Sequence, residues 1–331
     1  MDTIQHMNAR PTKRGDRWLI NRESKEDCLT KLRSENFSRI TLSFYKYVYL
    51  GTEDEVYDLR DELYLLLDDL GCLGRIYLAQ EGINAQMSVP EHQWDAFVSL
   101  LYSFPAFNNV PLKIGVEQGE SFWKLNVRVK KQIVADGLAL GEYNIENVGT
   151  HLDAEAFNRE MAHPETIVVD MRNAYESEIG HFEGALTPAS HTFREEIKEV
   201  VETLQGKEDK KVLLYCTGGI RCEKASAYLK SKGFNDVNQL HGGIIAYKHQ
   251  IEEEGLENKF KGANFVFDGR TREVISDEIL GSCATCGNAC DFHRNCTHQP
   301  CNKLFLQCDT CVEEQLGTCS EHCKVSLHAY V

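Results

Sequence analysis

The sequence predicts an α/β protein of 331 residues in three parts: an α+β sandwich, a domain with a parallel sheet, and a cysteine-rich C-terminal region. Three observations predict this organisation. Apolar runs and helical periodicities first follow the order β-α-β-β-α-β, and short buried strands then alternate with amphipathic helices. Nine of the thirteen cysteines lie between Cys283 and Cys323. We expect the chain to divide into residues 1–38, 39–136, 137–149, 150–258 and 259–331.

The first segment, residues 1–38, is expected to form a polar, basic arm with partial order at best. Its basic residues include Lys13, Arg14, Arg17, Arg22 and Lys25. It lacks the apolar core of a signal peptide, and no apolar run in the chain has the length of a membrane span. We therefore expect a cytoplasmic protein without a membrane partner.

The second segment, residues 39–136, has the order of elements typical of a ferredoxin-like sandwich. We expect strands and helices at residues 40–48, 53–70, 75–79, 85–89, 90–102 and 111–116, followed by a strand pair around Val127 and residues 133–134. Residues 124–131 alternate apolar and basic side chains, as a half-buried strand with a basic outer face does. That face is either an ordinary solvated surface or a nucleic-acid contact. The net charge of −15 weighs against general binding to phosphate backbones, so such a contact should be local.

Residues 137–149 are expected to form a linker, and residues 150–258 alternate strands with helices. Thr150 is expected to cap the first helix of this part. The further elements are expected at residues 166–170, 191–204, 212–215, 223–230 and 236–240, with a last helix from residue 244. Such alternation implies a parallel sheet, whose sites gather at the carboxyl ends of the strands. Asp170 and Cys216 stand at two such ends.

The loop from Cys216 to Arg221 is the candidate catalytic site. It leaves a buried strand and opens a helix, so backbone N–H groups and the positive helix end point at the sulfur and favour a thiolate. We interpret Cys216 as the nucleophile or sulfur carrier and Arg221 as a charge that lowers its pKa. The N–H groups that would stabilise the sulfur belong to Arg221 and to the loop residues Thr217, Gly218, Gly219 and Ile220.

Other interpretations of this loop remain open. Cys216 could be a buried structural cysteine at a strand end. Cys222 could resolve an oxidised Cys216 as a disulfide, but we expect a helix cysteine that faces the core. Four residues separate Cys216 from Arg221, one fewer than in the related phosphatase loop, so the loop favours a sulfur carried on the cysteine over a phosphate.

The C-terminal region has cysteine pairs at spacings typical of metal sites. Eight cysteines are the expected ligands: Cys283, Cys286, Cys296, Cys301, Cys308, Cys311, Cys319 and Cys323. They would fill two four-sulfur sites and leave Cys290 over. A histidine could replace a cysteine, the candidates being His293, His298 and His322. We favour structural zinc, which would fold a segment with few large apolar residues, over iron–sulfur clusters and then disulfides.

Four motifs of the parallel-sheet domain follow the order found in rhodanese domains. They are Asp170-x-Arg172, Gly180-His181-x-x-Gly184-Ala185, the loop from Cys216 to Arg221, and Gly242-Gly243. This part of the chain therefore resembles a rhodanese domain. Asp170 and Arg172 are expected to support the loop as a structural salt bridge beneath it. His181 and His241 lie in the turn motifs and are expected to be structural.

The resemblance extends beyond that domain. Residues 44–47, 79–86, 133–137 and 216–224 are similar to those of the oxygen-dependent tRNA wobble-uridine hydroxylases. The resemblance implies an acylphosphatase-like N-terminal domain, a central rhodanese domain and a cysteine-rich tail. It also implies that the wobble uridine of tRNA becomes 5-hydroxyuridine, with molecular oxygen as co-substrate and the essential cysteine at Cys216.

Two further functions are compatible with the loop. The alternative is a persulfide-forming sulfurtransferase supplied by thiosulfate or a protein sulfur donor. A non-catalytic adaptor is third, and the presence of Cys216, both loop glycines and Arg221 argues against it. The sequence has no dinucleotide fingerprint and no two-histidine-one-carboxylate set, so we expect no flavin, NAD or mononuclear iron site. It makes no prediction of the oligomeric state.

Overall fold

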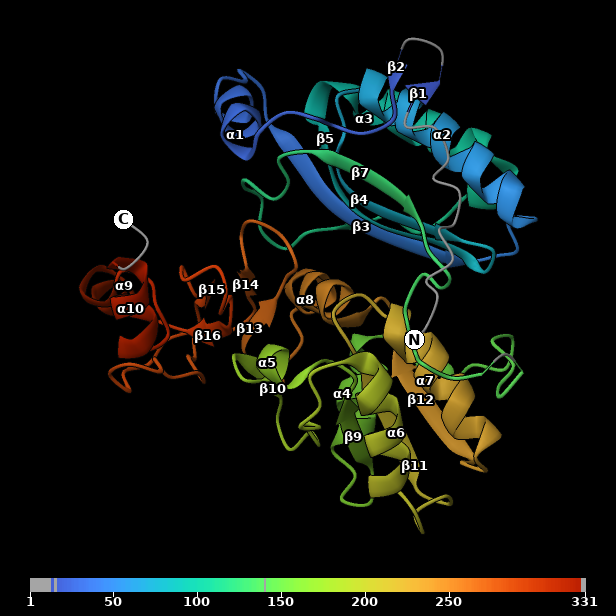
Figure 1. Cartoon of the computed structure of the whole chain (residues 1–331). Coiled ribbons are helices and arrows are strands. Elements are labelled where there is room, and N and C mark those ends of the chain that lie inside the picture. The colour runs from blue at the N-terminus through green and yellow to red at the C-terminus, as the bar shows by residue number, and fades with distance from the viewer. Residues whose placement is uncertain (1–12, 15–16, 140, 329–331) are drawn as a thin grey trace, which may run out of the picture. The chain divides into compact units, whose positions relative to one another are not determined.

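The computed structural model describes residues 13–14, 17–139 and 141–328, which fall into two compact units (Figure 1). The first unit ends at Ile133 and the second begins at Val134. Residues 1–12, the start of the expected arm, lie outside the described residues. Within the described ranges, no helix combines the length and the apolar character needed to cross a membrane.

The first unit is built on a five-stranded sheet, which confirms the ferredoxin-like sandwich (Figure 1). The strand order is β6-β3-β5-β4-β7, and neighbours are antiparallel except β4 and β7. The strands are β3 (Arg39–Tyr47), β4 (Leu73–Ala79), β5 (Gly82–Pro90), β6 (Lys113–Ile114) and β7 (Leu125–Val129). Because side chains alternate along a strand, the apolar residues gather on one face.

The helices α2 (Glu53–Asp69) and α3 (Trp94–Ser103) cover that apolar face. α2 begins at a reciprocal capping box. Thr52 Oγ1 accepts a hydrogen bond from the N–H of Glu55, and the Glu55 carboxylate accepts one from the N–H of Thr52 at 2.7 Å. Short 3₁₀ turns at Glu91–Gln93 and Pro105–Phe107 precede and follow α3.

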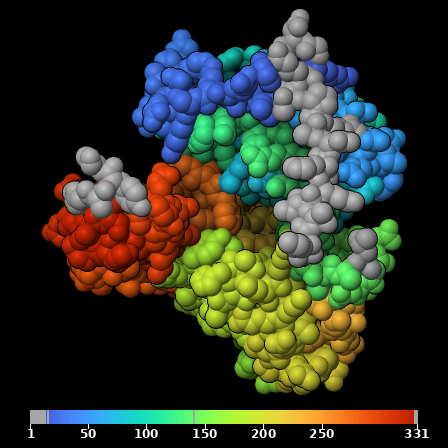
Figure 2. All heavy atoms as spheres, in the orientation of Figure 1, coloured from blue at the N-terminus to red at the C-terminus, as the bar shows by residue number. Residues whose placement is uncertain are grey.

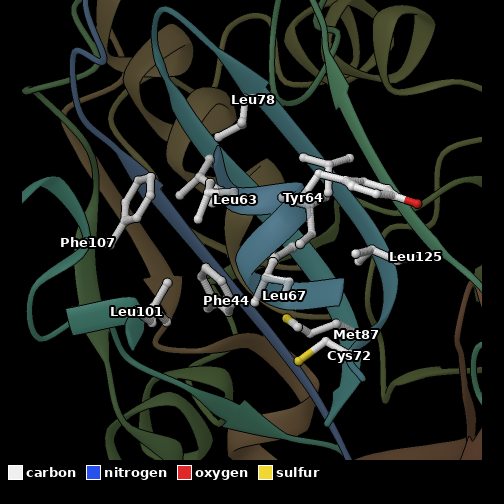
Figure 3. Packing of buried hydrophobic residues seen from close by; sticks show 14 of the residues in the cluster. Phe44, Leu63, Tyr64, Leu67, Cys72, Leu78, Met87, Leu101, Phe107 and Leu125 are labelled. Atoms are coloured by element: carbon white, nitrogen blue, oxygen red, sulfur yellow. The ribbon is translucent and has the colours of Figure 1, made fainter. Parts of the chain in front are cut away.

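The core of the sandwich lies between the helices and the sheet (Figure 3). Leu63 and Leu67 of α2 and Leu101 of α3 pack in one cluster with the strand residues Phe44 and Leu78. Burial of each such side chain contributes roughly 1.5–3 kcal/mol to folding. The strand residues that point to the opposite face of the sheet are mostly half-exposed.

The segment expected to be an arm is more ordered than its sequence pattern indicated. It contains the short strands β1 (Lys13–Arg14) and β2 (Arg17–Trp18) and the helix α1 (Lys25–Arg33). Ser24 caps α1 and accepts a hydrogen bond from the N–H of Asp27 at 3.1 Å. Leu19 is fully buried in the sandwich core and ties the segment down. A single apolar anchor produces no periodicity, so the sequence pattern did not reveal it.

The expected strand at residues 133–134 is wrong. Ile133 is buried, but its N–H donates to the Glu81 carboxylate at 2.7 Å and not to a neighbouring strand. Its carbonyl accepts a hydrogen bond from the Asn84 side chain at 3.2 Å. Side chains therefore satisfy the backbone groups that a strand partner would have satisfied.

The second unit contains a parallel sheet in the order β8-β12-β11-β9, as the alternation of elements predicted. Its strands are β8 (Thr150–Leu152), β9 (Ile167–Asp170), β11 (Lys211–Tyr215) and β12 (Asp236–Leu240). Its helices are α4 (Ala154–Met161), α5 (Ala174–Ser177), α6 (Phe193–Thr203), α7 (Ile220–Ser231) and α8 (Gly243–Glu254). Residues of α6 and α7 share one core with β9 and β11.

The expected cap at Thr150 is wrong. Thr150 pairs with Asn238 in the parallel sheet, and the helix begins four residues later, at Ala154. Asp153 is the cap of α4, since its Oδ1 accepts a hydrogen bond from the N–H of Ala156 at 2.8 Å. A strand of three residues is too short to show a period of two, so its pairing with β12 was not predictable locally.

A second, antiparallel sheet joins the parallel-sheet domain to the C-terminal region. β10 (Gly180–Phe182) pairs with β13 (Phe260–Phe265), which pairs with β14 (Arg272–Val274). The cysteine-rich segment adds β15 (His293–Asn295), β16 (Leu304–Leu306), α9 (Asp309–Gln315) and α10 (Glu321–His328). Figure 2 shows this red segment packed against the rest of the second unit, where Ile179 shares a core with Leu306.

Candidate active site and metal-binding groups

Cys216 directly follows β11, and Asp170 ends the neighbouring strand β9. Tyr215 and Asp170 are register partners, so both candidate residues lie at the carboxyl edge of the sheet. Gly219 has a φ of 95°, a left-handed conformation that glycine adopts without strain, and α7 begins at the next residue. The helix therefore starts earlier than expected and carries Arg221 and Cys222 in its first turn.

The sulfur of Cys216 is fully buried and surrounded by hydrogen-bond donors. The N–H of Gly219 donates to Sγ at 3.1 Å, and the N–H groups of Cys222 and Arg221 also donate to it. Burial alone would raise the pKa of Cys216. The hydrogen bond from the Cys222 thiol, the charge of Arg221 and these N–H groups outweigh burial and lower the pKa to about 6. Cys216 is therefore mostly a thiolate at neutral pH.

Arg221 is paired with a carboxylate to which the sequence reasoning gave no role. Its Nη1 and Nη2 donate to the two oxygens of Glu176 at 2.6 and 2.9 Å, and Glu176 is fully buried. Burial opposes the charge of Arg221, but Glu176 raises its pKa above the usual value. Glu176 lies in α5, where its carboxylate also accepts a hydrogen bond from the N–H of Asn173 at 3.0 Å. That capping pattern was the available sequence signal.

Glu196 is a second buried carboxyl that the sequence reasoning missed. It is 0% exposed, and neither carboxyl oxygen has a hydrogen-bond partner among the residues that the structure describes. Burial raises its pKa well above the usual range, Arg221 opposes this effect, and the nearby Asp170, Glu176 and Cys216 add to it. Burial therefore favours the neutral form of the Glu196 carboxyl. The signal for it was a carboxyl on the apolar face of α6, next to a core residue.

Asp170 and Arg172 form a fully buried ion pair close to this loop. Arg172 Nε and Nη2 donate to the Asp170 oxygens at 2.9 and 2.7 Å. Tyr215 Oη donates to the same carboxylate at 2.8 Å, and Arg172 also donates to the carbonyl of Gly180 and to Asn264. The pair therefore fastens β9 to β11, β10 and β13, and its geometry is that of a brace for the loop.

Cys222 faces both the core and the active sulfur. It is 0% exposed and belongs to the core cluster of α6 and α7, as a structural helix cysteine would. Its thiol also hydrogen-bonds to Cys216. Burial is the main cause that raises the pKa of Cys222 well above the usual thiol value, so it stays a protonated donor. The two cysteines meet because α7 begins at Ile220, so that Cys222 lies in its first turn.

The two histidines of the turn motifs lie in different surroundings. His181 Nδ1 donates to the carbonyl of Ser177 at 3.0 Å. His241 lies edge-to-face on His151, with ring centroids 5.6 Å apart. His151 was not singled out from the sequence. Its Nε2 lies 3.0 Å from Glu223 Oε1, and this hydrogen bond raises the pKa of His151.

The position of Gly243 shows why the Gly242-Gly243 motif needs a glycine as its second residue. Its φ is 70°, and a Cβ at this position would lie 2.5 Å from the carbonyl oxygen of Cys216 and 2.6 Å from that of Thr217. The N–H groups of Ile244 and Ile245 donate to these two carbonyls at 3.0 and 3.2 Å. The start of α8 therefore packs so closely against the loop from Cys216 to Arg221 that residue 243 has no room for a Cβ atom.

The eight candidate ligands of the C-terminal region lie in two groups of four. One group is Cys283, Cys286, Cys308 and Cys311, and the other is Cys296, Cys301, Cys319 and Cys323. The sulfur atoms of each group lie within 4.8 Å of one another, so each group could hold a metal ion. Neither group contains a histidine or Cys290, and all thirteen cysteines are free thiols in the structure.

Two bacterial proteins named tRNA uridine(34) hydroxylase are similar to this chain over most of its length. The protein of Leptospira interrogans is 54% identical over 94% of this chain and 84% of its own length. The protein of Enterobacter sp. is 48% identical over 92% of this chain and 87% of its own length. This chain belongs to the tRNA uridine(34) hydroxylase family.

The family models match the chain in three consecutive parts. The UPF0176 acylphosphatase-like domain matches residues 39–133, the rhodanese-like domain matches residues 153–250, and the rhodanase C-terminal region matches residues 261–324. The solution structure of a rhodanese-like domain from Anabaena sp. is 22% identical and covers 40% of this chain and 91% of its own, with a TM-score of 0.28. In this member of the hydroxylase family, the loop from Cys216 to Arg221 lies in the rhodanese-like match and both cysteine groups lie in the C-terminal match.

Proposed function

We propose that this protein converts the wobble uridine of tRNA to 5-hydroxyuridine in the cytoplasm, with molecular oxygen as co-substrate and Cys216 as the essential residue. Relatives with this name cover most of the chain, which supports the substrate. The observation that carries the chemistry is the buried Cys216 sulfur, whose pKa is lowered to about 6 by the donors around it. These donors supply a nucleophile at neutral pH.

The proposed role of Cys216 follows from the chemistry of uracil. A thiolate, or a persulfide formed on it by transfer from a sulfane-sulfur donor, would add to C6 of the ring and make C5 nucleophilic toward oxygen. Loss of the C5 proton would then expel the sulfur, and a thiol reductant would supply the two electrons that release the second oxygen atom as water. Glu196 is buried close to Arg221 with a raised pKa, and it is a candidate source of the proton that the ring takes up or returns. Asp170 and Arg172 support the loop from below and act through its geometry.

We further propose that each cysteine group holds one structural zinc ion. Tetrahedral zinc with Zn–S bonds of about 2.3 Å places neighbouring sulfurs about 3.8 Å apart. The sulfurs of Cys286 and Cys308 are 3.7 Å apart, and those of Cys301 and Cys319 are 3.6 Å apart. The N–H of Cys308 also donates to Cys283 at 3.4 Å, a contact that stabilises a metal-bound thiolate. Zinc would supply folding energy here, and the reaction at Cys216 would not involve it.

A persulfide-forming sulfurtransferase is the second candidate. The ring of N–H donors around Cys216 would stabilise a terminal persulfide sulfur as well as a thiolate. The donor would be thiosulfate or a protein persulfide. Thiocyanate formation from thiosulfate and cyanide, at the rate of a true rhodanese and without any 5-hydroxyuridine, would favour this candidate over the hydroxylase.

The test is mass spectrometry of tRNA nucleosides from cells that lack the gene. Complementation with the wild-type gene should restore 5-hydroxyuridine, and Cys216→Ser or Cys216→Ala should not. The matched control is Cys28→Ser, because Cys28 is also buried but lies in α1 of the first unit. Full restoration by Cys216→Ala would refute the proposed role of this cysteine.

A further inference from the structure

The face of the first-unit sheet opposite to its helices carries tyrosines and basic residues in register. Tyr45 of β3, Asn84 of β5, Tyr77 of β4 and Arg128 of β7 are consecutive partners across four strands. The next row along the strands is formed by Ser43, Gln86, Arg75 and Asn126, and Lys113 of β6 pairs with Ser43. Residues that are partners in register point to the same side of the sheet, so all of these side chains lie on one face.

The cations on this face lie over aromatic rings. Lys113 Nζ is 4.1 Å from the ring centroid of Tyr45, and Lys130 Nζ is 5.4 Å from that of Tyr77. The rings of Tyr45 and Tyr47 meet edge-to-face at 6.2 Å. Tyr45 and Tyr77 are partly exposed, and they stand two strands apart, which corresponds to roughly 10 Å. The face therefore offers separate aromatic platforms, each with a cation beside it.

The charge of the first unit is divided between its two sides. None of the strands β3 to β7 contains an aspartate or glutamate. The helix α2, which covers the opposite face, contains eight acidic residues and one basic residue. In a chain with a net charge of −15, this face is therefore the side of the first unit to which a polyanion would be steered.

We infer that this sheet face binds single-stranded RNA of the tRNA substrate by stacking unpaired bases on Tyr45 and Tyr77, with Arg75, Lys113 and Arg128 on the phosphates. The inference rests on the proposed function, which makes tRNA the substrate. Unpaired bases have exposed ring faces that can stack on tyrosine, whereas a continuous duplex keeps them covered. The face thus fits the nucleotides of an anticodon loop better than a helical stem.

The experiment measures binding of a fluorescently labelled anticodon stem-loop RNA with a wobble uridine to the full chain by fluorescence anisotropy. Tyr45→Leu and Tyr77→Leu should each weaken binding by about tenfold, because each removes one stacking platform. Tyr45→Phe and Tyr77→Phe keep the ring and should bind like the wild type. A blunt duplex with the sequence of the stem should compete poorly.

The salt dependence of RNA binding gives a second readout. It would not change if Arg75 and Lys113 had only a structural role. Arg75→Gln and Lys113→Gln should each reduce the slope of log affinity against log salt by about 0.7. Lys198→Gln in α6, which removes one exposed charge from the second unit, should leave the slope unchanged. If the leucine variants fail to fold, Arg128→Gln and Lys130→Gln carry the test, because both side chains are exposed.

The inference is overturned if the leucine variants bind like the phenylalanine variants, or if the duplex competes as well as the stem-loop. Nucleoside analysis of the same proteins separates this result from a failure of the proposed function. A wild-type protein that forms no 5-hydroxyuridine contradicts the function whatever its affinity for RNA. Active leucine variants with unchanged affinity contradict only the binding face.

Discussion

Replacing Cys222 by alanine should raise the pKa of Cys216 and withdraw the thiolate from neutral pH. The hydrogen bond from the Cys222 thiol is the largest contribution in favour of the thiolate, ahead of the charge of Arg221. A hydrogen bond to a charged group contributes about 1.5–3 kcal/mol, and one pH unit corresponds to about 1.4 kcal/mol. The pKa of Cys216 should therefore rise from about 6 by roughly one to two pH units.

The direction of the pH dependence follows from this shift. In the wild type the thiolate forms above a pH of about 6, so activity that needs it is lost as the pH falls through that value. At neutral pH roughly nine-tenths of the wild-type sulfur is ionised, against at most about half in Cys222→Ala. The activity of the variant should therefore fall at neutral pH and recover at alkaline pH.

The ionisation can be read from the pH profile of alkylation by iodoacetamide. Trypsin cleaves after Lys211 and Arg221, so the peptide from Val212 to Arg221 contains Cys216 as its only cysteine. Isotopic labelling and mass spectrometry of this peptide report the reactivity of Cys216 alone. Cys222→Ser keeps a hydrogen-bond donor and should have a midpoint close to that of the wild type. A midpoint of about 6 in Cys222→Ala would refute the reasoning.

Two other predictions concern the loop support and the metal groups. Gly243→Ala should lower the free energy of unfolding by about 1–3 kcal/mol more than Gly255→Ala, because both glycines have positive φ but only Gly243 would clash with the loop. Urea denaturation of the full chain measures the difference, and equal costs would contradict it. Cys286→Ser and Cys301→Ser should each lose one of two metal ions per chain, whereas Cys290→Ser should keep both; elemental analysis of the purified proteins decides.

The fold was predictable where local patterns repeat. The β-α-β-β-α-β order and the alternation of strands and helices are carried by runs of four or more residues, and the structure confirms both. The predictions failed at short strands and at segments that a single side-chain contact holds in place. Thr150 enters a three-residue strand, Ile133 is held by the side chain of Glu81, and Leu19 joins the core as a single anchor. None of these produces a period in the sequence.

The sequence predicted the loop of the candidate site, but it did not predict the side-chain contacts around that loop. The position of Cys216 between a buried strand and a helix follows from local sequence. The partner of Arg221 does not, because Glu176 is 45 residues away and meets it only through the strand order. The meeting of Cys222 with Cys216 depends on the residue at which α7 begins, and sequence patterns fix helix boundaries least well.

These contacts change the role that the loop arginine can have. Both terminal nitrogens of Arg221 are held by Glu176, so the pair acts on the sulfur as a dipole and not as a free cation. Glu196 is buried without a hydrogen-bond partner among the described residues, and its raised pKa disfavours a negative charge beside Cys216. The thiolate is therefore stabilised first by the Cys222 thiol, then by the charge of Arg221, and then by the N–H groups at the start of α7. A rhodanese-type loop that carries the cysteine and arginine but lacks these two carboxyls and the second cysteine would have a different sulfur pKa, so loop sequence alone does not define the chemistry.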